Sequence, residues 1–179
     1  MGQRWGRFRR GPITSKPNMK KYSTLLISMA LPVSLLLGAA DPFTGKWTMN
    51  LQKSKFAPGT LPKQMMIEME TAGAGVRYHS ETTNAQGRLS SSSYTADYNG
   101  PQVIVMGSSG MQAPVSLKRI DANTVEARYM KNLEVVATSR RVVSKDGRVM
   151  TVSTTSKDKA GVSVTNVGVY EKAQLAVVR

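Results

Sequence analysis

Residues 63–83 read KQMMIEMETAGAGVRYHSETT, and this stretch decides the class of fold. Apolar and polar side chains alternate on both sides of a glycine-rich centre, which is the period of an extended strand. A hairpin with Gly73–Ala74 at its tip brings opposite charges together on one face and apolar groups together on the other. The facing pairs in that register are Glu70 with Arg77, Glu68 with His79, and Met69 with Tyr78. The stretch therefore predicts an antiparallel β-hairpin.

The same alternation recurs along residues 41–179, and no window there has a sustained apolar repeat of 3.6 residues. The segments with a strand pattern are Thr44–Gln52, Lys63–Thr71, Val76–Thr83, Arg88–Tyr98, Gln102–Met106, Val115–Ile120, Thr124–Met130, Val135–Ser144, Val149–Thr155 and Val162–Glu171. Short connections rich in Gly, Asn and Asp join them, which favours antiparallel hairpins because a parallel crossover is longer. The sequence therefore predicts an all-β fold: an antiparallel up-and-down meander of about 8–10 strands closed into a barrel or clam.

Three of the connections differ from ordinary tight turns. Gly107–Gly110 is interpreted as a long hairpin tip, because it lacks the strand-to-helix setting of a phosphate-binding loop. Asn132-Leu133 is a weak turn, since Leu disfavours the left-handed conformation that a tight hairpin demands. Lys53–Pro62 contains Pro58 and Gly59, and we expect it to form an exposed loop over one end of the barrel.

The first 40 residues have the order of a secretory signal peptide. Lys20 and Lys21 precede the apolar residues 25–37, and Gly38-Ala39-Ala40 follows with small residues at the exit. Residues 19–40 are therefore predicted to be removed after Ala40, because the apolar stretch falls short of the ~20 residues that span a bilayer. Since Met19 by itself starts such a signal, residues 1–18 are either a genuine extension or a misassigned start.

The mature chain is then residues 41–179, a single β-barrel domain with no membrane span, exported to the periplasm or secreted. Of the formal charge of +14, seven basic residues lie in residues 1–40, which hold no acid. Residues 41–179 carry 18 Lys and Arg against 11 Asp and Glu, so we expect only loose contact with anionic envelope surfaces. Few aromatics interleave the basic residues, so no nucleic-acid partner is predicted.

The residues that carry chemistry are few, so we predict no enzyme. The absence of cysteine excludes disulfides, thiolate catalysis and Cys-ligated metals. His79 is the only histidine, and the hairpin register puts it on the solvent face beside Glu68. A surface pair explains it better than catalysis. We expect no catalytic residue, no metal site and no cofactor.

Two polar features fit either a cavity or the surface. If Ser90–Ser93 belongs to a strand, alternate hydroxyls face inward, where they would suit a hydrated cavity; an edge strand with little buried surface explains them equally well. In Arg140-Arg141 and in Lys118-Arg119, alternation turns the two side chains to opposite faces. One arginine of each pair either points into the barrel, where it could receive a ligand carboxylate, or lies at an exposed rim.

The stretch Phe43-Thr44-Gly45-Lys46-Trp47 resembles the opening strand of the calycins, the lipocalins and fatty-acid-binding proteins, and Val169–Lys172 is similar to the last strand of the fatty-acid-binding proteins. The resemblance implies a lipocalin-like barrel with Trp47 across its closed end and a small apolar ligand inside. It also points to small lipocalin-like exported bacterial proteins, mostly uncharacterised. Gly168 stands where the fatty-acid-binding proteins carry an arginine, so their carboxylate anchor does not carry over, and Lys53–Pro62 replaces their two-helix lid. The tail 173–179 is too short for the lipocalin helix.

The leading functional hypothesis is an exported, non-catalytic binding protein for a small apolar or amphipathic, lipid-like ligand. The alternative is a cell-envelope or extracellular interaction module with a basic surface and no internal ligand. Candidate ligand-binding residues are Trp47, Tyr78, Ser91, Ser93, Tyr129, Arg140 and Tyr170, and Tyr94 is a further candidate lining residue. An internal cavity would favour the first hypothesis, and a filled interior would favour the second.

Overall fold

The computed structural model describes residues 2, 40–58, 60–108, 110–158 and 160–173. The residues from Ala40 to Ala173 belong to one compact unit. The predicted extension, residues 1–18, and the predicted signal peptide, residues 19–40, lie outside the described residues except for Gly2 and Ala40.

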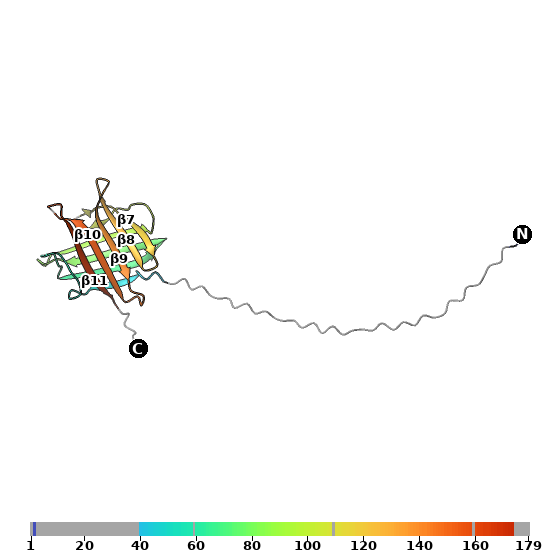
Figure 1. Cartoon of the computed structure of the whole chain (residues 1–179), viewed down its shortest axis with the longest axis horizontal. Coiled ribbons are helices and arrows are strands. Elements are labelled where there is room, and N and C mark those ends of the chain that lie inside the picture. The colour runs from blue at the N-terminus through green and yellow to red at the C-terminus, as the bar shows by residue number, and fades with distance from the viewer. Residues whose placement is uncertain (1, 3–39, 59, 109, 159, 174–179) are drawn as a thin grey trace, which may run out of the picture. The chain divides into compact units, whose positions relative to one another are not determined.

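The described chain is all-β, as predicted, and its strands form one curled antiparallel sheet (Figure 1). The strands are β1 (Gly45–Met49), β2 (Gln64–Ala72), β3 (Gly75–Thr83), β4 (Leu89–Asp97), β5 (Met106–Gly107), β6 (Gly110–Met111), β7 (Val115–Asp121), β8 (Thr124–Lys131), β9 (Glu134–Val143), β10 (Val149–Lys157) and β11 (Ser163–Lys172). Their order in the sheet is β6-β5-β4-β3-β2-β1-β11-β10-β9-β8-β7. Sequence neighbours therefore pair, except for β6 and β7, which are the two ends of the order, and β1 pairs with β11. The meander prediction is confirmed.

The hairpin at residues 63–83 has the predicted register, with Glu70 opposite Arg77, Glu68 opposite His79 and Met69 opposite Tyr78. Arg77 and Glu70 form an ion pair with an N–O distance of 3.0 Å. The ionic partner of Glu68 is Lys46 on β1, however, and the imidazole of His79 lies 3.4 Å from Glu81. His79 is on the outer face, where the sequence predicts it.

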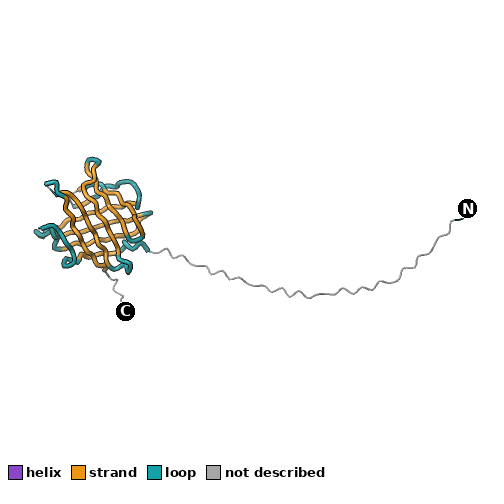
Figure 2. The backbone as a smooth tube through the Cα atoms, viewed as in Figure 1, coloured by secondary structure: helices purple, strands orange, loops and turns teal. Residues whose placement is uncertain are grey.

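The segment Gln102–Met106 is not the strand that its sequence predicts. Only Met106 belongs to a strand, the two-residue β5, whose hairpin with β6 turns at Gly107–Gly110 as expected. The segment instead closes the sheet: Val103 exchanges two backbone hydrogen bonds with Val115 on β7, and Asn99 N–H donates to the Leu117 carbonyl. These bonds link the β4 side of the sheet to the edge strand β7. Figure 2 shows that the described chain is built of strands and loops.

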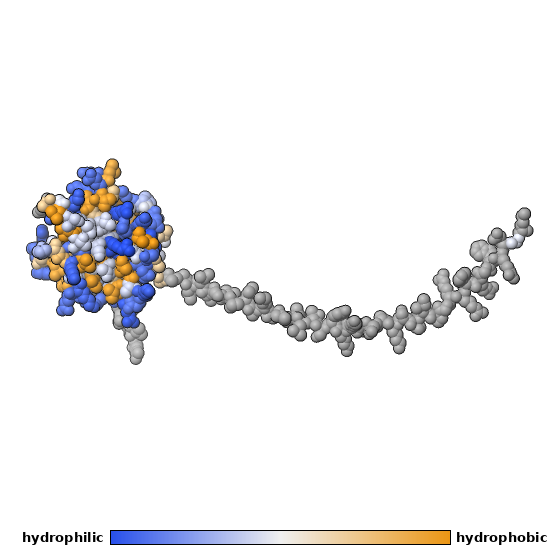
Figure 3. Space-filling view, viewed as in Figure 1, coloured by the Kyte–Doolittle hydropathy of each residue, from blue (hydrophilic) through white to orange (hydrophobic). Residues whose placement is uncertain are grey.

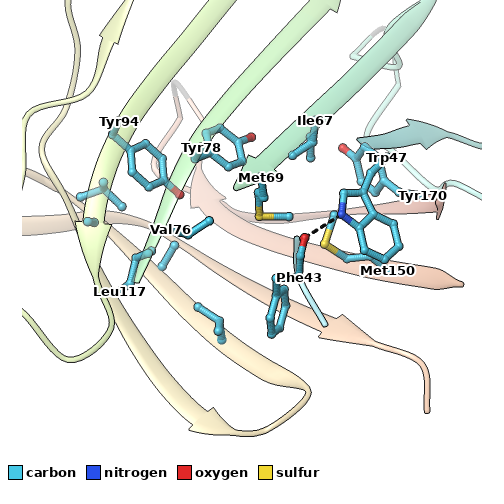
Figure 4. Packing of buried hydrophobic residues seen from close by; sticks show 14 of the residues in the cluster. Phe43, Trp47, Ile67, Met69, Val76, Tyr78, Tyr94, Leu117, Met150 and Tyr170 are labelled. Atoms are coloured by element: carbon cyan, nitrogen blue, oxygen red, sulfur yellow. Dashed lines mark hydrogen bonds between the residues drawn. The ribbon is translucent and has the colours of Figure 1, made fainter. Parts of the chain in front are cut away.

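The barrel has two unlike ends. At the closed end the chain enters β1, and Trp47 and Phe43 are fully buried there with Met150 and Ile67 (Figure 4). The Trp47 indole N–H donates to the Phe43 carbonyl at 2.8 Å, so burial leaves its polar atom satisfied. At the open end lie the turns that join β3 to β4, β8 to β9 and β10 to β11.

An ion-pair network ties the start of the described chain to the closed end. The Asp41 carboxylate accepts hydrogen bonds from the guanidinium of Arg119 at 2.6 Å and from the hydroxyl of Tyr98 at 2.8 Å. The Arg119 guanidinium also lies over the Tyr98 ring, 3.9 Å from its centroid. Of the pair Lys118-Arg119, the half-buried member is therefore used within the fold.

Candidate functional site

A cavity of about 280 Å³ lies inside the barrel toward the open end. Strands β2, β3 and β8 to β11 supply its walls, and Phe56 adds an aromatic ring from the loop after β1. The lining residues are Phe56, Met65, Ile67, Tyr78, Tyr129, Ala137, Ser139, Arg141, Val152, Thr154, Asn166, Gly168 and Tyr170. Apolar and aromatic side chains surround a few polar groups, which is the usual composition of a small-molecule site.

The loop Lys53–Pro62 does more than cover one end of the barrel. Lys55 forms a bridge with Val167 on β11, and Ala57 N–H donates to the Asn166 side chain at 2.8 Å. The loop therefore extends the β1–β11 pairing toward the open end and carries Phe56 into the cavity wall.

Arg141 is the only charged side chain that is buried among the described residues, with 3% of its surface exposed. It reaches the cavity because Ser139, Arg141 and Val143 alternate toward the interior along β9. One guanidinium nitrogen donates to the Tyr129 hydroxyl at 3.3 Å, and the guanidinium carbon lies 4.7 Å from the centroid of the Tyr78 ring. No Asp or Glu in the described chain forms an ion pair with it.

Arg141 is a cation at neutral pH. Burial, the largest influence, lowers the pKa of the guanidinium, but Coulombic attraction to Tyr94, Tyr129 and Tyr78 in their ionised, alkaline forms outweighs burial and raises that pKa above its ordinary value. Arginine is protonated in proteins in any case. A buried cation without a carboxylate partner is unfavourable unless other groups compensate it.

The surrounding tyrosines are neutral and cannot balance that charge. Burial is the largest cause that raises the pKa of Tyr78, Tyr94 and Tyr170. The rings of Tyr78 and Tyr94 stack with centroids 4.7 Å apart, and the Tyr170 hydroxyl contacts the Met65 sulfur at 3.0 Å. The Tyr94 hydroxyl is buried without a hydrogen-bond partner in the described structure. The cavity wall therefore holds a cation among tyrosines that are neutral at physiological pH.

Three of the predicted binding residues meet at this cavity: Tyr78, Tyr129 and Tyr170. Trp47 does not reach it, because it is buried in the closed-end core. The choice of Arg140 is wrong as to which arginine faces inward: Arg140 is exposed on the outer face of β9, and Arg141 lines the cavity. The sequence predicts one inward arginine in this pair without saying which.

Ser91 and Ser93 are also placed on the wrong face by the prediction. Tyr94 and Ala96 are the buried residues of β4, so Ser91 and Ser93 share the outer face with Thr95. Of the serine run, the inward Ser92 donates to the side chain of Gln112 at 2.8 Å and does not line the cavity.

Gly168 lines the cavity, and its lack of a side chain leaves room for the ring of Tyr170. Val152 is paired with Arg141 on one side and with Gly168 on the other, so the three residues form a row across β9, β10 and β11. A Cβ at Gly168 would lie 2.8 Å from the Tyr170 ring. The prediction missed Phe56, Ser139, Thr154 and Asn166 as lining residues, because their contacts come from strand pairing between distant segments.

Metal and membrane-span signals are missing from the part of the chain that the structure describes. It contains no group of three His, Asp or Glu side chains that could hold a metal ion. It also contains no helix with the length and apolar character needed to cross a bilayer.

Neither a comparison with protein-family models nor one with curated protein sequences gives a match. Solved structures do match the fold. Zebrafish ileal bile acid-binding protein complexed with cholic acid superposes with a TM-score of 0.50 at 10% identity, over 74% of this chain and 99% of that one. A Schistosoma mansoni fatty acid binding protein in complex with arachidonic acid gives a TM-score of 0.51 at 14% identity, over 76% and 100%. At these identities the likeness concerns the fold alone, and it agrees with the predicted antiparallel β-barrel.

Proposed function

We propose that this chain is an exported, non-catalytic binding protein for a small amphipathic molecule whose acidic head group pairs with Arg141. The observation that carries the proposal is the buried guanidinium of Arg141, which has no carboxylate partner among the described residues and lies in the wall of a largely apolar cavity. The two solved barrels described above, complexed with cholic acid and arachidonic acid, support the same ligand class.

The electrostatics favour an anionic head over a neutral one. A carboxylate accepts two parallel hydrogen bonds from a guanidinium, and such charge-assisted bonds are stronger than neutral ones. A ligand carboxylate would thus compensate a charge that the described fold leaves uncompensated. The Tyr129 hydroxyl, 3.3 Å from the guanidinium, is within reach of the same head group.

The cavity sets an upper bound on ligand size. Its volume of about 280 Å³ is just below the roughly 300–1,000 Å³ that is usual for small-molecule sites. Phe56, Ile67 and Val152 offer contacts for a short apolar tail. Export rests on the sequence of residues 19–40 alone.

Titration with matched acid and alcohol probes tests the proposal. A fluorescent fatty-acid analogue should bind at micromolar concentration, and Arg141→Met should weaken it at least tenfold, because hydrogen bonds to charged groups contribute about 1.5–3 kcal/mol. The affinity for the corresponding alcohol should change little in Arg141→Met, because the alcohol carries no charge to pair with the guanidinium. Arg140→Met, which changes the neighbouring exposed arginine, is the matched control and should bind like the parent protein. Equal affinity in the parent and in Arg141→Met would refute the assigned anchor.

The second candidate is an envelope interaction module that uses the basic surface. It is favoured by the excess of 18 Lys and Arg over 11 Asp and Glu in residues 41–179. If native mass spectrometry of the protein from its own host finds no copurified ligand and no probe binds, this candidate takes first place.

A further inference from the structure

Leu133 occupies a position that the fold itself does not favour. It forms the two-residue tip of the β8–β9 hairpin with Asn132, between the facing residues Lys131 and Glu134. Both tip residues have positive φ, 50° for Asn132 and 68° for Leu133. Such a turn prefers Asn-Gly, and a left-handed Leu is strained. Because 93% of the Leu133 surface is exposed, burial within the chain does not offset that strain.

A β-bulge lies between this tip and the cavity. Tyr129 faces Ala137 and Met130 faces Val135, so Val136 is an extra residue on β9. The bulge adjoins two cavity-lining residues, Tyr129 on β8 and Ala137 on β9. It interrupts the alternation that would bury one of two neighbours, and Val135 and Val136 are both exposed.

These exposed side chains lie close to the β10–β11 turn. A groove of about 250 Å³ is lined by Val135 and Val136 together with Lys157 and Ser163. The residue before Ser163 is Val162, which is 58% exposed. We call Leu133, Val135, Val136 and Val162 the rim patch. Figure 3 shows hydrophobic side chains at the tip of a projecting hairpin, beside hydrophilic ones.

Two lysines adjoin the rim patch: Lys131 precedes the hairpin tip, and Lys157 lines the groove. The basic residues at this end of the described barrel are Lys55, Lys63, Arg88, Lys131 and Lys157, and none is in an ion pair among the described residues. The acidic residues at the same strand ends and turns are Glu81, Asp158 and Glu134, which directly follows Leu133. Asp158 is occupied by its own turn, where it accepts bonds from Ala160 and Val162. The excess is positive, as it is for residues 41–179 as a whole.

We propose that the rim patch docks on the surface of an anionic lipid bilayer and that the ligand passes there between bilayer and cavity; the transfer step rests on the proposed function. Exposed apolar side chains flanked by lysines combine the two forces that hold proteins at such an interface. A second copy of the chain fits less well, because it would bring two sets of lysines together. Since the patch adjoins Tyr129 and Ala137, docking sets the cavity beside the acyl chains.

Vesicle flotation of the full chain tests the docking without any ligand. The protein should float with vesicles of phosphatidylcholine and phosphatidylglycerol, and less with phosphatidylcholine alone or at high salt. Leu133→Asn suits the turn and should weaken partitioning about tenfold, since a buried Leu side chain contributes on the order of one to two factors of ten. Ile120→Asn removes an exposed apolar side chain at the closed end and should have no effect. Residues 1–39 are the same in all variants, so any contribution they make to vesicle binding cancels when the variants are compared with the parent protein.

The outcomes separate docking from ligand binding. Arg141→Met should weaken binding of the acid probe at least tenfold and leave flotation unchanged. Failure of the parent protein to float, or equal flotation of Leu133→Asn, overturns the docking surface while the cavity proposal stands. A concentration-dependent dimer that Leu133→Asn disperses, without vesicle binding, would also overturn it and assign the patch to self-association.

Discussion

The guanidinium carbon of Arg141 lies 4.7 Å from the centroid of the Tyr78 ring, and Tyr78 itself stacks on Tyr94. A cation held over an aromatic face gains about 2 kcal/mol or more when it is desolvated. That contribution makes the ligand-free site tolerable without an anion. It does not equal the pairing that a carboxylate would provide.

The ligand-free protein should therefore become more stable when Arg141 is replaced by Met. Apolar replacements of buried ionic groups are often neutral or stabilising by about 1–4 kcal/mol, and we expect an increase of about 1–2 kcal/mol in the free energy of unfolding. Urea denaturation measures the change. Arg140→Met should stay within about 0.5 kcal/mol of the parent protein. A clear loss of stability in Arg141→Met would show that the guanidinium is compensated within the fold.

Features that depend on contacts within one segment were predictable from the sequence, and features that depend on contacts between distant segments were not. The register of residues 63–83 was predictable because both charge pairs and the apolar pair agree on one alignment. The role of residues 98–105 was not, because Val103 and Asn99 bond to β7, which carries no pairing signal visible from their own segment. The alternation that separates Arg140 from Arg141 is visible, but the interior face depends on neighbouring strands. For the same reason Ser91 and Ser93 were predicted to face the interior, although they lie on the outer face of β4.

Buried tyrosines should make the fold sensitive to alkali. Burial is the main cause that raises the pKa of Tyr78, Tyr94, Tyr98 and Tyr170, so above the ordinary pKa of about 10 the unfolded chain loses protons that the folded chain keeps. Stability is then fully present below pH ~10 and falls as the pH rises, by about 1.4 kcal/mol per pH unit for each tyrosine. Denaturation midpoints across this range measure the slope. Tyr170→Phe removes one of these groups, so it should make the slope of stability against pH shallower by about 1.4 kcal/mol per pH unit. An unchanged slope would contradict the raised pKa of Tyr170.

Trp47→Ala should cost more stability than truncation of any tyrosine. Trp47 is fully buried and its indole N–H is bonded to the Phe43 carbonyl, so truncation leaves a large void and an unpaired carbonyl at a cost of about 3–5 kcal/mol. Trp47→Phe keeps much of the side-chain volume, so its stability should lie between that of the parent protein and that of Trp47→Ala. A denaturation midpoint that Trp47→Ala leaves in place would mean that the closed-end core does not depend on this residue.

Leu133→Gly and Leu133→Asn should both stabilise the protein. The φ of 68° at Leu133 is accessible to Gly and favoured by Asn over Leu, so we expect a gain of about 0.5–1 kcal/mol in the free energy of unfolding. Leu89→Asn, at another exposed leucine that does not have positive φ, serves as the control and should show no gain. Stabilisation confined to Leu133 would establish that the parent protein keeps a strained residue at its tip.

Asp41→Asn should loosen the closed end. The Asp41 carboxylate is bonded to both Arg119 and Tyr98, and both members of the ion pair are mostly shielded from solvent. Loss of a charged acceptor at a partly buried site costs about 1–3 kcal/mol, because the two donors keep their desolvation without their partner. Glu171→Gln removes the exposed partner of Lys53 and should cost less than about 1 kcal/mol.

Hydrogen exchange should show where Asp41→Asn acts. Exchange should become faster at the backbone amides of Asn99 and Val103, which close the sheet against β7. The amides of the β10–β11 ladder should keep their protection. Uniform acceleration across both regions would show that Asp41 stabilises the barrel as a whole and not its closure.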